Sequence, residues 1–326
     1  MSAYDDLAAR LAAKDVVILD GAVGTQLQAM GVPMSGTAWA ATALQTHPYT
    51  VRRMHELYIE AGAEIVTTNT YASARHNLEP LGMGDLVAEL NIRAVLLAKD
   101  ARDKAANGRR VFIAGSVSNF GLLTGSEDYS DKEGWAAYFA NRSELTEAQC
   151  RANLREQADL LAEAGVDFLL AEATGSTAHR RWVVDACVAT GLPVWAGFKC
   201  HQRADDATVR MGYCSDDTLD GTVAEIMGLG PVGLAMFHTV PSTTTASLPI
   251  VRDHWDGPVA VYPEAERHDY VAAYRDPEVA TTIGPAEFVA FAQDAVAQGV
   301  QIVGGCCGIE LDHIRALKDA LPSHVA

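Results

Sequence analysis

The chain has 326 residues, of which 49% are hydrophobic and 21% are charged, and its formal net charge is −17 at pH 7. This composition is typical of a globular protein with a large core, and so acidic a surface disfavours nucleic acid and anionic membranes as partners. Six cysteines in a chain of this length do not make a disulfide framework.

The sequence also lacks the signals of secretion and of a membrane anchor. It begins with the acidic pair Asp5 and Asp6 where a secretory signal carries basic residues. No run approaches the roughly 18 consecutive apolar residues that a membrane-spanning helix needs. We therefore expect a cytoplasmic protein with reduced thiols, and homo-oligomerisation stays open.

Short apolar runs alternate along the chain with longer stretches of helical period. The runs predict strands at residues 16–19, 64–67, 111–114, 167–170, 193–198, 232–236, 259–262 and 301–303. The amphipathic stretches predict helices at 49–61, 86–106, 151–164 and 285–298. This alternation predicts an α/β fold, a closed (β/α)8 TIM barrel that spans residues 1–326 as a single domain. An open doubly wound sheet is the alternative, but no G-x-G-x-x-G motif follows the first run.

Polar and metal-binding side chains fall at the carboxyl ends of the predicted strands, where barrel enzymes build their active sites. In chain order these residues are Asp20, Gly21, Thr68, Asn69, Tyr71, Ser116, Glu172, Lys199, Cys200, His238, Glu264, Cys306 and Cys307. Each has an ordinary explanation as a cap, a turn former or a surface ion-pair partner. Their shared position at strand ends favours one functional site.

The last predicted strand runs into the sequence Gly304-Gly305-Cys306-Cys307-Gly308. Neighbouring side chains in a strand point to opposite faces, so two adjacent thiols share a target only where the chain leaves strand geometry. Glycine permits that departure because it has no Cβ. Two thiolates at a strand end are natural zinc ligands, and a packed buried pair or a redox pair are the alternatives.

These motifs together resemble the homocysteine S-methyltransferase family over nearly the whole chain. The resemblance is carried by residues 18–25 (ILDGAVGT), 55–72, 114–116, 164–172 and 299–317. It implies a barrel in which a zinc-bound homocysteine thiolate attacks the methyl group of a sulfonium or ammonium donor and yields methionine. The chemistry is sensible, because a free thiol has a pKa near 8.5 and coordination to Zn²⁺ removes its proton.

The resemblance also implies roles for individual residues. Cys306 and Cys307 would supply two of three ligands to a Zn²⁺ cofactor, and Asp20 and Glu172 would hold the substrate amino group. Backbone N–H groups from Gly21 to Val23 would receive the substrate carboxylate. The implied lining of the substrate cavity is Thr68, Asn69, Tyr71 and Ser116.

The chain departs from the family at the sixth and seventh predicted strands. Phe237-His238 stands where the family has Asn-Cys, whose cysteine is its third zinc ligand, and Glu264 stands in place of an asparagine. His238 is interpreted as the third ligand; a metal-free or weakly binding site, or Cys200 as third ligand, are the alternatives. Zinc with two thiolates and a neutral imidazole carries no net charge, whereas three thiolates leave −1.

The methyl donor is not determined by the sequence: S-methylmethionine, S-adenosylmethionine and betaine-like compounds all remain. The predicted loops 117–141 and 201–219 are long enough to cover a donor. Their aromatic residues offer cation–π faces or simply pack the loops: Phe120, Tyr129, Trp135, Tyr138 and Tyr213.

Other functions also remain open. One alternative is a divergent barrel that binds an amino acid or a metal without methyl transfer, and another is methylation of a different thiol. A metal-dependent hydrolase is disfavoured, because His47, His55 and His76 do not have ligand spacing.

Overall fold

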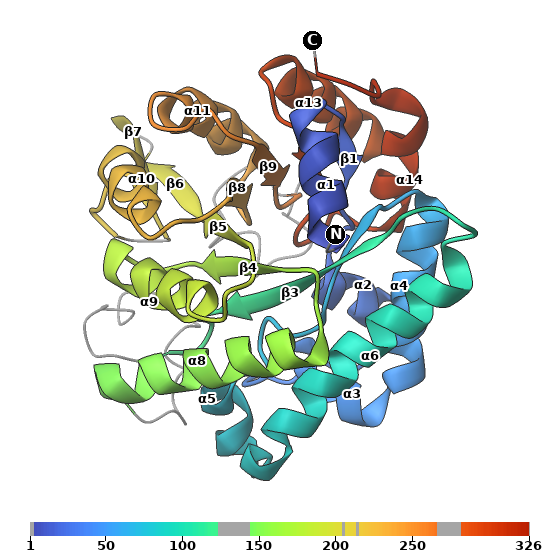
Figure 1. The fold of residues 1–326 in the computed structure, drawn as a ribbon, viewed down its shortest axis with the longest axis vertical. Helices are drawn as coiled ribbons and strands as arrows, with labels where there is room; N and C mark the ends of the chain where they lie inside the picture. The colour runs from blue at the N-terminus through green and yellow to red at the C-terminus, as the bar shows by residue number, and fades with distance from the viewer. Residues whose placement is uncertain (1–2, 123–143, 204–205, 213–214, 266–281, 326) are drawn as a thin grey trace.

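Eight parallel strands form the central sheet of the protein (Figure 1). The computed structural model describes residues 3–122, 144–203, 206–212, 215–265 and 282–325. The strands follow the order β1-β10-β9-β8-β5-β4-β3-β2 around the sheet. Their bounds are β1 (Val17–Ile18), β2 (Ile65–Thr67), β3 (Phe112–Ser118), β4 (Phe168–Ala173), β5 (Val194–Phe198), β8 (Gly233–Phe237), β9 (Val259–Tyr262) and β10 (Ile302–Val303). Each of the eight predicted strands is confirmed.

The sheet closes on itself between β1 and β2. Leu19 forms a parallel bridge with Ile65, and the backbone N–H of Asp20 donates to the carbonyl of Ile65 at 2.9 Å. On the other side of the junction, the N–H of Glu64 donates to the carbonyl of Ile18 at 2.8 Å. The fold is therefore the predicted (β/α)8 barrel, and the open doubly wound sheet is excluded.

Helices surround the barrel (Figure 1). Their bounds are α1 (Ala3–Ala12), α2 (Val23–Ala29), α3 (Ala43–Thr46), α4 (Pro48–Ala61), α5 (Arg75–Leu78), α6 (Val87–Ala105), α8 (Glu147–Ala164), α9 (Thr177–Val188), α10 (Leu219–Met227), α11 (Pro241–Arg252), α13 (Pro285–Ala297) and α14 (Leu311–Ala320), with 3₁₀ turns at Ala40–Thr42, Glu79–Leu81 and Gly84–Leu86. The four predicted helices are confirmed as α4, α6, α8 and α13. Within the described part of the chain, no helix is long and apolar enough to cross a membrane.

Local signals explain where helix α8 begins and ends. The Thr146 side chain accepts from the N–H of Gln149, and the Gln149 side chain accepts from the N–H of Thr146, which satisfies two exposed donors of the first turn. The helix ends at Gly165, whose φ of +81° places it in the left-handed region that glycine adopts without strain.

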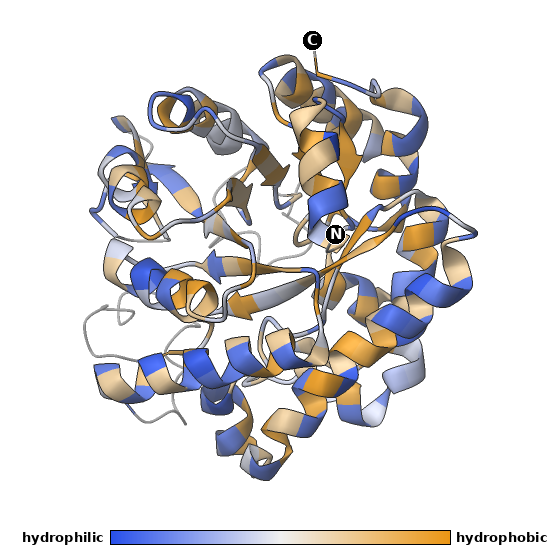
Figure 2. Cartoon of the chain, viewed as in Figure 1, coloured by the Kyte–Doolittle hydropathy of each residue, from blue (hydrophilic) through white to orange (hydrophobic). Residues whose placement is uncertain are grey.

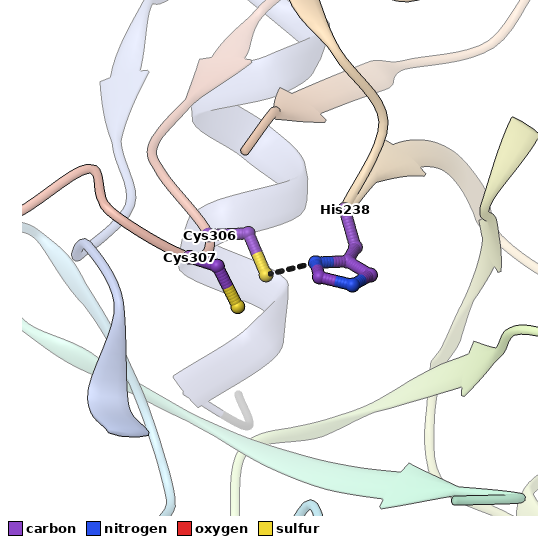
Figure 3. Close-up of side chains that lie close together, drawn as sticks. All are labelled: His238, Cys306 and Cys307. Carbon is purple, nitrogen blue, oxygen red and sulfur yellow. Dashed lines mark hydrogen bonds between the residues drawn. The ribbon is translucent and has the colours of Figure 1, made fainter. Parts of the chain in front are cut away.

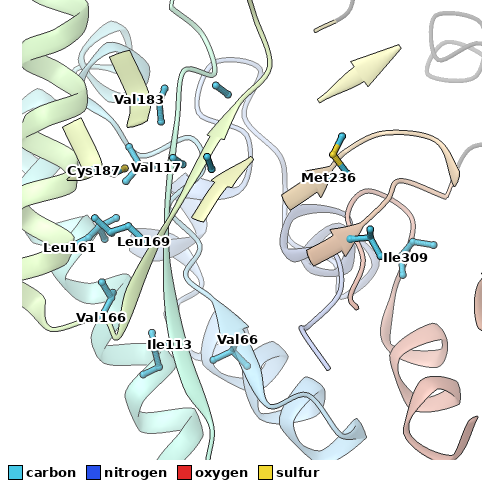
Figure 4. Packing of buried hydrophobic residues seen from close by; sticks show 14 of the residues in the cluster. Val66, Ile113, Val117, Leu161, Val166, Leu169, Val183, Cys187, Met236 and Ile309 are labelled. Carbon is cyan, nitrogen blue, oxygen red and sulfur yellow. The ribbon is translucent and has the colours of Figure 1, made fainter. Parts of the chain in front are cut away.

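The strands separate two apolar cores, because alternate side chains face opposite sides. Ile65 and Phe112 belong to the cluster inside the barrel, and their neighbours Val66 and Ile113 belong to the cluster under the helices. Figure 4 shows part of the outer cluster, in which Leu161 of α8 packs towards Leu169 of β4. Figure 2 shows apolar strands at the centre and mixed helices around them, as burial of both sheet faces requires.

Helix α1 packs against the interior cluster at the amino end of the strands. Its residues Tyr4, Leu7 and Leu11 are buried in the same cluster as Phe168, the first residue of β4. The indole Nε1 of Trp195 donates to the Tyr4 hydroxyl at 3.0 Å. With the amino end covered by this helix, the carboxyl end of the barrel is left for a site.

The segment after β5 differs from the loop predicted at 201–219. Strands β6 (Cys200–Arg203) and β7 (Asp206–Met211) pair in an antiparallel two-stranded sheet. Helices α10 and α11 pack beside this hairpin. Four of the predicted donor-facing aromatics, Tyr129, Trp135, Tyr138 and Tyr213, lie outside the described residues.

Candidate metal and substrate site

The two adjacent cysteines follow a stretch in which side chains larger than glycine do not fit. A Cβ on Gly304 would lie 2.6 Å from the Leu19 side chain, and a Cβ on Gly305 would lie 2.1 Å from the Ile309 side chain. β10 accordingly ends at Val303, and the N–H of Cys306 donates to the carbonyl of Pro263 at 2.8 Å. The chain thus leaves strand geometry before the cysteines, as the glycines predicted, and both sulfurs come together (Figure 3).

His238 meets the cysteine pair from the end of β8. Its Nδ1 lies 3.4 Å from the Sγ of Cys306, and Figure 3 shows the ring facing that sulfur. One ligand atom from each of His238, Cys306 and Cys307 lies within 4.8 Å of the other two. Two sulfurs and an imidazole at this spacing fit a zinc ion with a fourth position left open.

Cys200, the alternative third ligand, is not part of this cluster. Among the described residues, the group that can hold a metal consists of His238, Cys306 and Cys307. Cys200 instead begins β6 and is 1% exposed. Burial raises the pKa of its thiol to about 11.

The thiols of Cys306 and Cys307 differ in pKa. Hydrogen bonding to Cys306 and the positive charge of His238 hold the pKa of Cys307 well below its usual range, against the effect of burial. The hydrogen bond with Cys307 and burial raise the pKa of Cys306 well above its usual range. Of the two thiols, Cys307 is therefore the more acidic.

A buried ion pair lies beside the same ring nitrogen of His238. The Nδ1 of His238 is 3.3 Å from an oxygen of Glu264, and the other oxygen of Glu264 is 3.7 Å from the Nζ of Lys199. Burial lowers the pKa of His238, but the negative charges of Glu264 and Cys307 outweigh it, so this pKa is raised. The sequence placed Lys199 and Glu264 at strand ends without pairing them. Their opposite charges, at the ends of β5 and β9 with only β8 between, were the available signal.

Two buried carboxylates, Asp20 and Glu172, lie at the same end of the barrel. Asp20 accepts the N–H of Thr67 at 2.8 Å and the Thr67 hydroxyl at 3.0 Å, and Glu172 accepts the hydroxyl of Ser116. Burial, reinforced by the charge of Glu172, raises the pKa of Asp20 to about 8. Burial and the charge of Cys307 raise the pKa of Glu172 to about 7. Two buried carboxylates, of which one raises the pKa of the other by its charge, suit a cationic group.

Ser116 and Glu172 lie within their strands rather than after them. β3 continues to Ser118 and β4 to Ala173, beyond the predicted ends of both strands. The register pairs Ser116 with Leu170 and Ser118 with Glu172. These two strands are therefore longer than the apolar runs indicated, because they end in small and polar residues that stay buried.

The backbone N–H groups from Gly21 to Val23 were predicted to bind the substrate carboxylate, and this prediction is wrong for Ala22. The N–H of Ala22 already donates to the carbonyl of Ile309 at 2.8 Å. A Cβ on Gly21 would lie 2.4 Å from that same oxygen, so the glycine at position 21 permits the close approach of the two segments. The segment after β1 packs tightly against the turn before α14. This packing uses the N–H of Ala22, which was expected to bind the substrate carboxylate.

The loop after β2 carries the remaining predicted residues and is held by its own hydrogen bonds. The hydroxyl of Thr68 lies 2.7 Å from that of Thr70, and the amide of Asn69 donates to the carbonyl of Ala40 at 2.9 Å. Tyr71 is half-buried, and its ring centre lies 5.3 Å from that of Phe120. Of these side chains, Tyr71 is the one with surface left for a ligand.

Gln157 of α8, which the sequence did not single out, holds this loop through hydrogen bonds. Its side-chain nitrogen donates to the carbonyl of Thr70 at 2.7 Å and to the hydroxyl of Ser73 at 3.1 Å. Asn91 of α6 donates to the carbonyl of Ser73 at 2.9 Å. Gln157, Ser73 and Asn91 are fully buried, so the loop position depends on these bonds.

Comparison with known proteins identifies the family of the chain. The family model "Homocysteine S-methyltransferase" matches residues 17–321. The chain is 25% identical to homocysteine S-methyltransferase 3 of Zea mays over 94% of its length and 90% of that protein. It is 26% identical to betaine–homocysteine S-methyltransferase 1 of Mus musculus over 96% of its length and 74% of that protein.

A solved structure shares the fold. The metallated form of the homocysteine methyltransferase MmuM from Escherichia coli superposes with a TM-score of 0.72 at 24% identity and covers 96% of this chain and 99% of that one. The family model covers nearly the whole barrel, including both carboxylates and the cysteine pair. The chain therefore belongs to the homocysteine S-methyltransferase family and is an S-methyltransferase.

Proposed function

We propose that the protein transfers a methyl group from a sulfonium or ammonium donor to the thiol of homocysteine bound at a zinc ion, and so forms methionine. The observation that carries the proposal is the convergence of His238, Cys306 and Cys307 to within 4.8 Å, at the barrel end where Asp20 and Glu172 are buried. Family membership supplies the reaction class, and the remaining steps rest on these residues.

The three ligand residues fit zinc better than other metals. Two sulfurs and one imidazole are a donor set that catalytic zinc sites use, and carboxylate-preferring ions such as Mg²⁺ do not match it. Zinc, when bound, removes the proton of the substrate thiol and fixes its sulfur. His238, Cys306 and Cys307 would hold the ion and leave one position for that sulfur.

Asp20 and Glu172 would bind the ammonium group of homocysteine. Their carboxylates are buried, and the charge of Glu172 disfavours ionisation of Asp20, so a bound cation would stabilise the ionised carboxylates. With the amino group held here and the sulfur held at the ligand cluster, the substrate is fixed at two points. Such fixation turns methyl transfer into a positioned displacement.

The donor would approach on the open side of the substrate sulfur. Tyr71, half-buried and packed on Phe120, offers an aromatic face to a positively charged donor. One relative is named for betaine as well as homocysteine, and another is named for homocysteine alone. These names do not select among S-methylmethionine, S-adenosylmethionine and betaine as the donor.

Methionine formation tests the proposal directly. Purified protein would be analysed for zinc and then incubated with homocysteine and each of the three donors, with methionine measured by mass spectrometry. We expect one zinc per chain and methionine from at least one donor. A protein that binds zinc and homocysteine but forms no methionine with any of them would be a binding barrel.

A further inference from the structure

Glu264 is a buried carboxylate whose surroundings are unusual. It is 1% exposed, and neither of its oxygens accepts a hydrogen bond from the described residues. Its close contacts are charged groups: Nδ1 of His238 at 3.3 Å and Nζ of Lys199 at 3.7 Å. Burying a carboxylate without hydrogen bonds costs free energy. We therefore expect the charge of Glu264 to stabilise one of its charged neighbours.

The backbone fixes these three side chains relative to one another. The N–H of His238 donates to the carbonyl of Tyr262 at 3.1 Å, and the N–H of Glu264 donates to the carbonyl of Thr239 at 3.3 Å. The Thr239 hydroxyl accepts the N–H of Cys200 at 2.9 Å, which ties the segment after β5 to the same frame. The approach of Glu264 to His238 is thus set by strand ends rather than by a flexible side chain alone.

We propose that Glu264 is a positioning residue for the metal ligand His238, and that Lys199 is its counter-ion. The ring nitrogen beside Glu264 is the one that faces the Cys306 sulfur, so the carboxylate acts through its charge on the ligand atom itself. This inference rests on the metal site of the proposed function and assigns it two further residues.

The charges explain why the carboxylate belongs beside a histidine. Zinc with two thiolates and a neutral imidazole has no net charge, and the imidazole becomes more positive as it gives electron density to the metal. Glu264 places a negative charge beside that ring, which stabilises the bound state. Lys199 balances the carboxylate, so that it is not left as an unpaired buried charge.

The two residues should therefore affect metal binding with opposite signs. Removing the Glu264 charge takes away stabilisation from the bound state, whereas removing the Lys199 charge leaves the carboxylate free to act on the ring. A purely structural ion pair behaves differently, because loss of either partner disturbs the same packing to a similar degree.

The experiment measures zinc affinity by competition with a chromophoric chelator. We expect Glu264→Gln to bind zinc about 10–100-fold more weakly, the range for residues that support a metal ligand, and Lys199→Met to bind it at least as tightly as the wild type. Glu56→Gln on α4, another glutamate with little exposure and with ion pairs to Arg52 and Arg53, is the matched control and should be unchanged. Circular dichroism verifies that each variant is folded.

A double variant keeps the test decisive if Lys199→Met does not fold. Lys199→Met with Glu264→Gln removes both charges, and its zinc affinity should equal that of Glu264→Gln alone. Wild-type affinity in Glu264→Gln, or equal losses in both single variants, would overturn the inference. Wild-type zinc content and methionine formation are measured in parallel, so failure of the proposed function is seen separately, in the unmodified protein.

Discussion

The Sγ atom of Cys306 lies 3.4 Å from Nδ1 of His238, although 68 residues separate the two in the chain. The contact joins the end of β8 to the end of β10, with β9 between them in the sheet. It places an imidazole where the family resemblance predicted a third sulfur ligand. Substitutions at position 238 test what this histidine does.

Replacing the histidine tests whether it is a ligand. We expect His238→Ala to lose zinc affinity by more than the ~100-fold that loss of a supporting residue costs, because a ligand itself is removed. Zinc stoichiometry by elemental analysis checks this. Full zinc occupancy in the variant would show that Cys306 and Cys307 hold the metal without the imidazole.

The reverse exchange tests the effect of ligand charge. His238→Cys recreates three thiolates and leaves the zinc site with a charge of −1 rather than 0, so the bound substrate sulfur becomes a stronger nucleophile. We expect retained zinc and a faster methyl transfer step in single-turnover assays. A rate equal to that of the wild type would mean that ligand charge does not limit the reaction.

The carboxylate Glu172 should act on the amino acid and not on the metal. Glu172→Ala removes one charge-assisted contact to the ammonium group, a loss of about 1.5–3 kcal/mol, or roughly 10–100-fold in homocysteine affinity. Isothermal titration calorimetry measures the affinity, and zinc content should stay unchanged. Glu163→Ala, at an exposed position on α8, is the control; an equal loss there would remove Glu172 from the site.

The raised pKa of Asp20 predicts how stability depends on pH. Its pKa is about 8 in the folded protein and near 3.8 in the unfolded chain, so between these values the folded state binds more protons. Stability from this group is full below pH 3.8 and is lost as the pH rises through 8, with a slope of up to about 1.4 kcal/mol per pH unit.

Urea denaturation of zinc-free protein between pH 6.5 and 8 measures the slope, and comparison with Asp20→Asn separates the Asp20 contribution from that of Glu172, whose pKa is about 7. Burial lowers the pKa of His55 from 6.5 to about 4, and its contribution to the slope near pH 6.5 is common to the wild type and the Asp20→Asn variant. We expect the wild type to lose stability as the pH rises and Asp20→Asn to show a shallower slope. Parallel slopes for the two proteins would contradict the assignment.

Gln157 should matter for both stability and substrate affinity. Gln157→Leu leaves the carbonyl of Thr70 without that donor, at a cost of about 1–3 kcal/mol in the free energy of unfolding. Because the supported loop carries Asn69 and Tyr71, homocysteine affinity should also fall while zinc content stays the same. Gln293→Leu removes an exposed glutamine bonded to the carbonyl of Ala320, and its effect should be within about 0.5 kcal/mol.

The barrel could be predicted because its strands are buried on both faces. Each then appears in the sequence as a continuous apolar run, and Val259–Tyr262 has the predicted bounds. The β6–β7 hairpin was missed because its second strand, Asp206–Met211, is partly exposed and has no such run. The far ends of β3 and β4 were missed because they contain Ser118 and Glu172, which no hydrophobic pattern includes.

The meeting of His238 with the cysteines followed from shared position on the rim, because strand ends in a closed barrel must converge. The contact of Glu264 with Lys199 and His238 did not follow, because it depends on side-chain directions that a sequence pattern does not contain. The same holds for Ala22, whose N–H is used by Ile309. Such pairings are decided by packing between segments far apart in the chain.

The backbone of His238 has a φ of +45°, in the left-handed region where a residue with a Cβ is strained and glycine is not. A glycine here would relieve about 1 kcal/mol of that strain and would remove the imidazole at the same time. The chain thus retains a less stable residue at its proposed metal site, a trade-off between stability and activity. In the zinc-free protein a glycine at this position would therefore be the more stable choice, whereas bound zinc would stabilise only the chain that keeps the histidine.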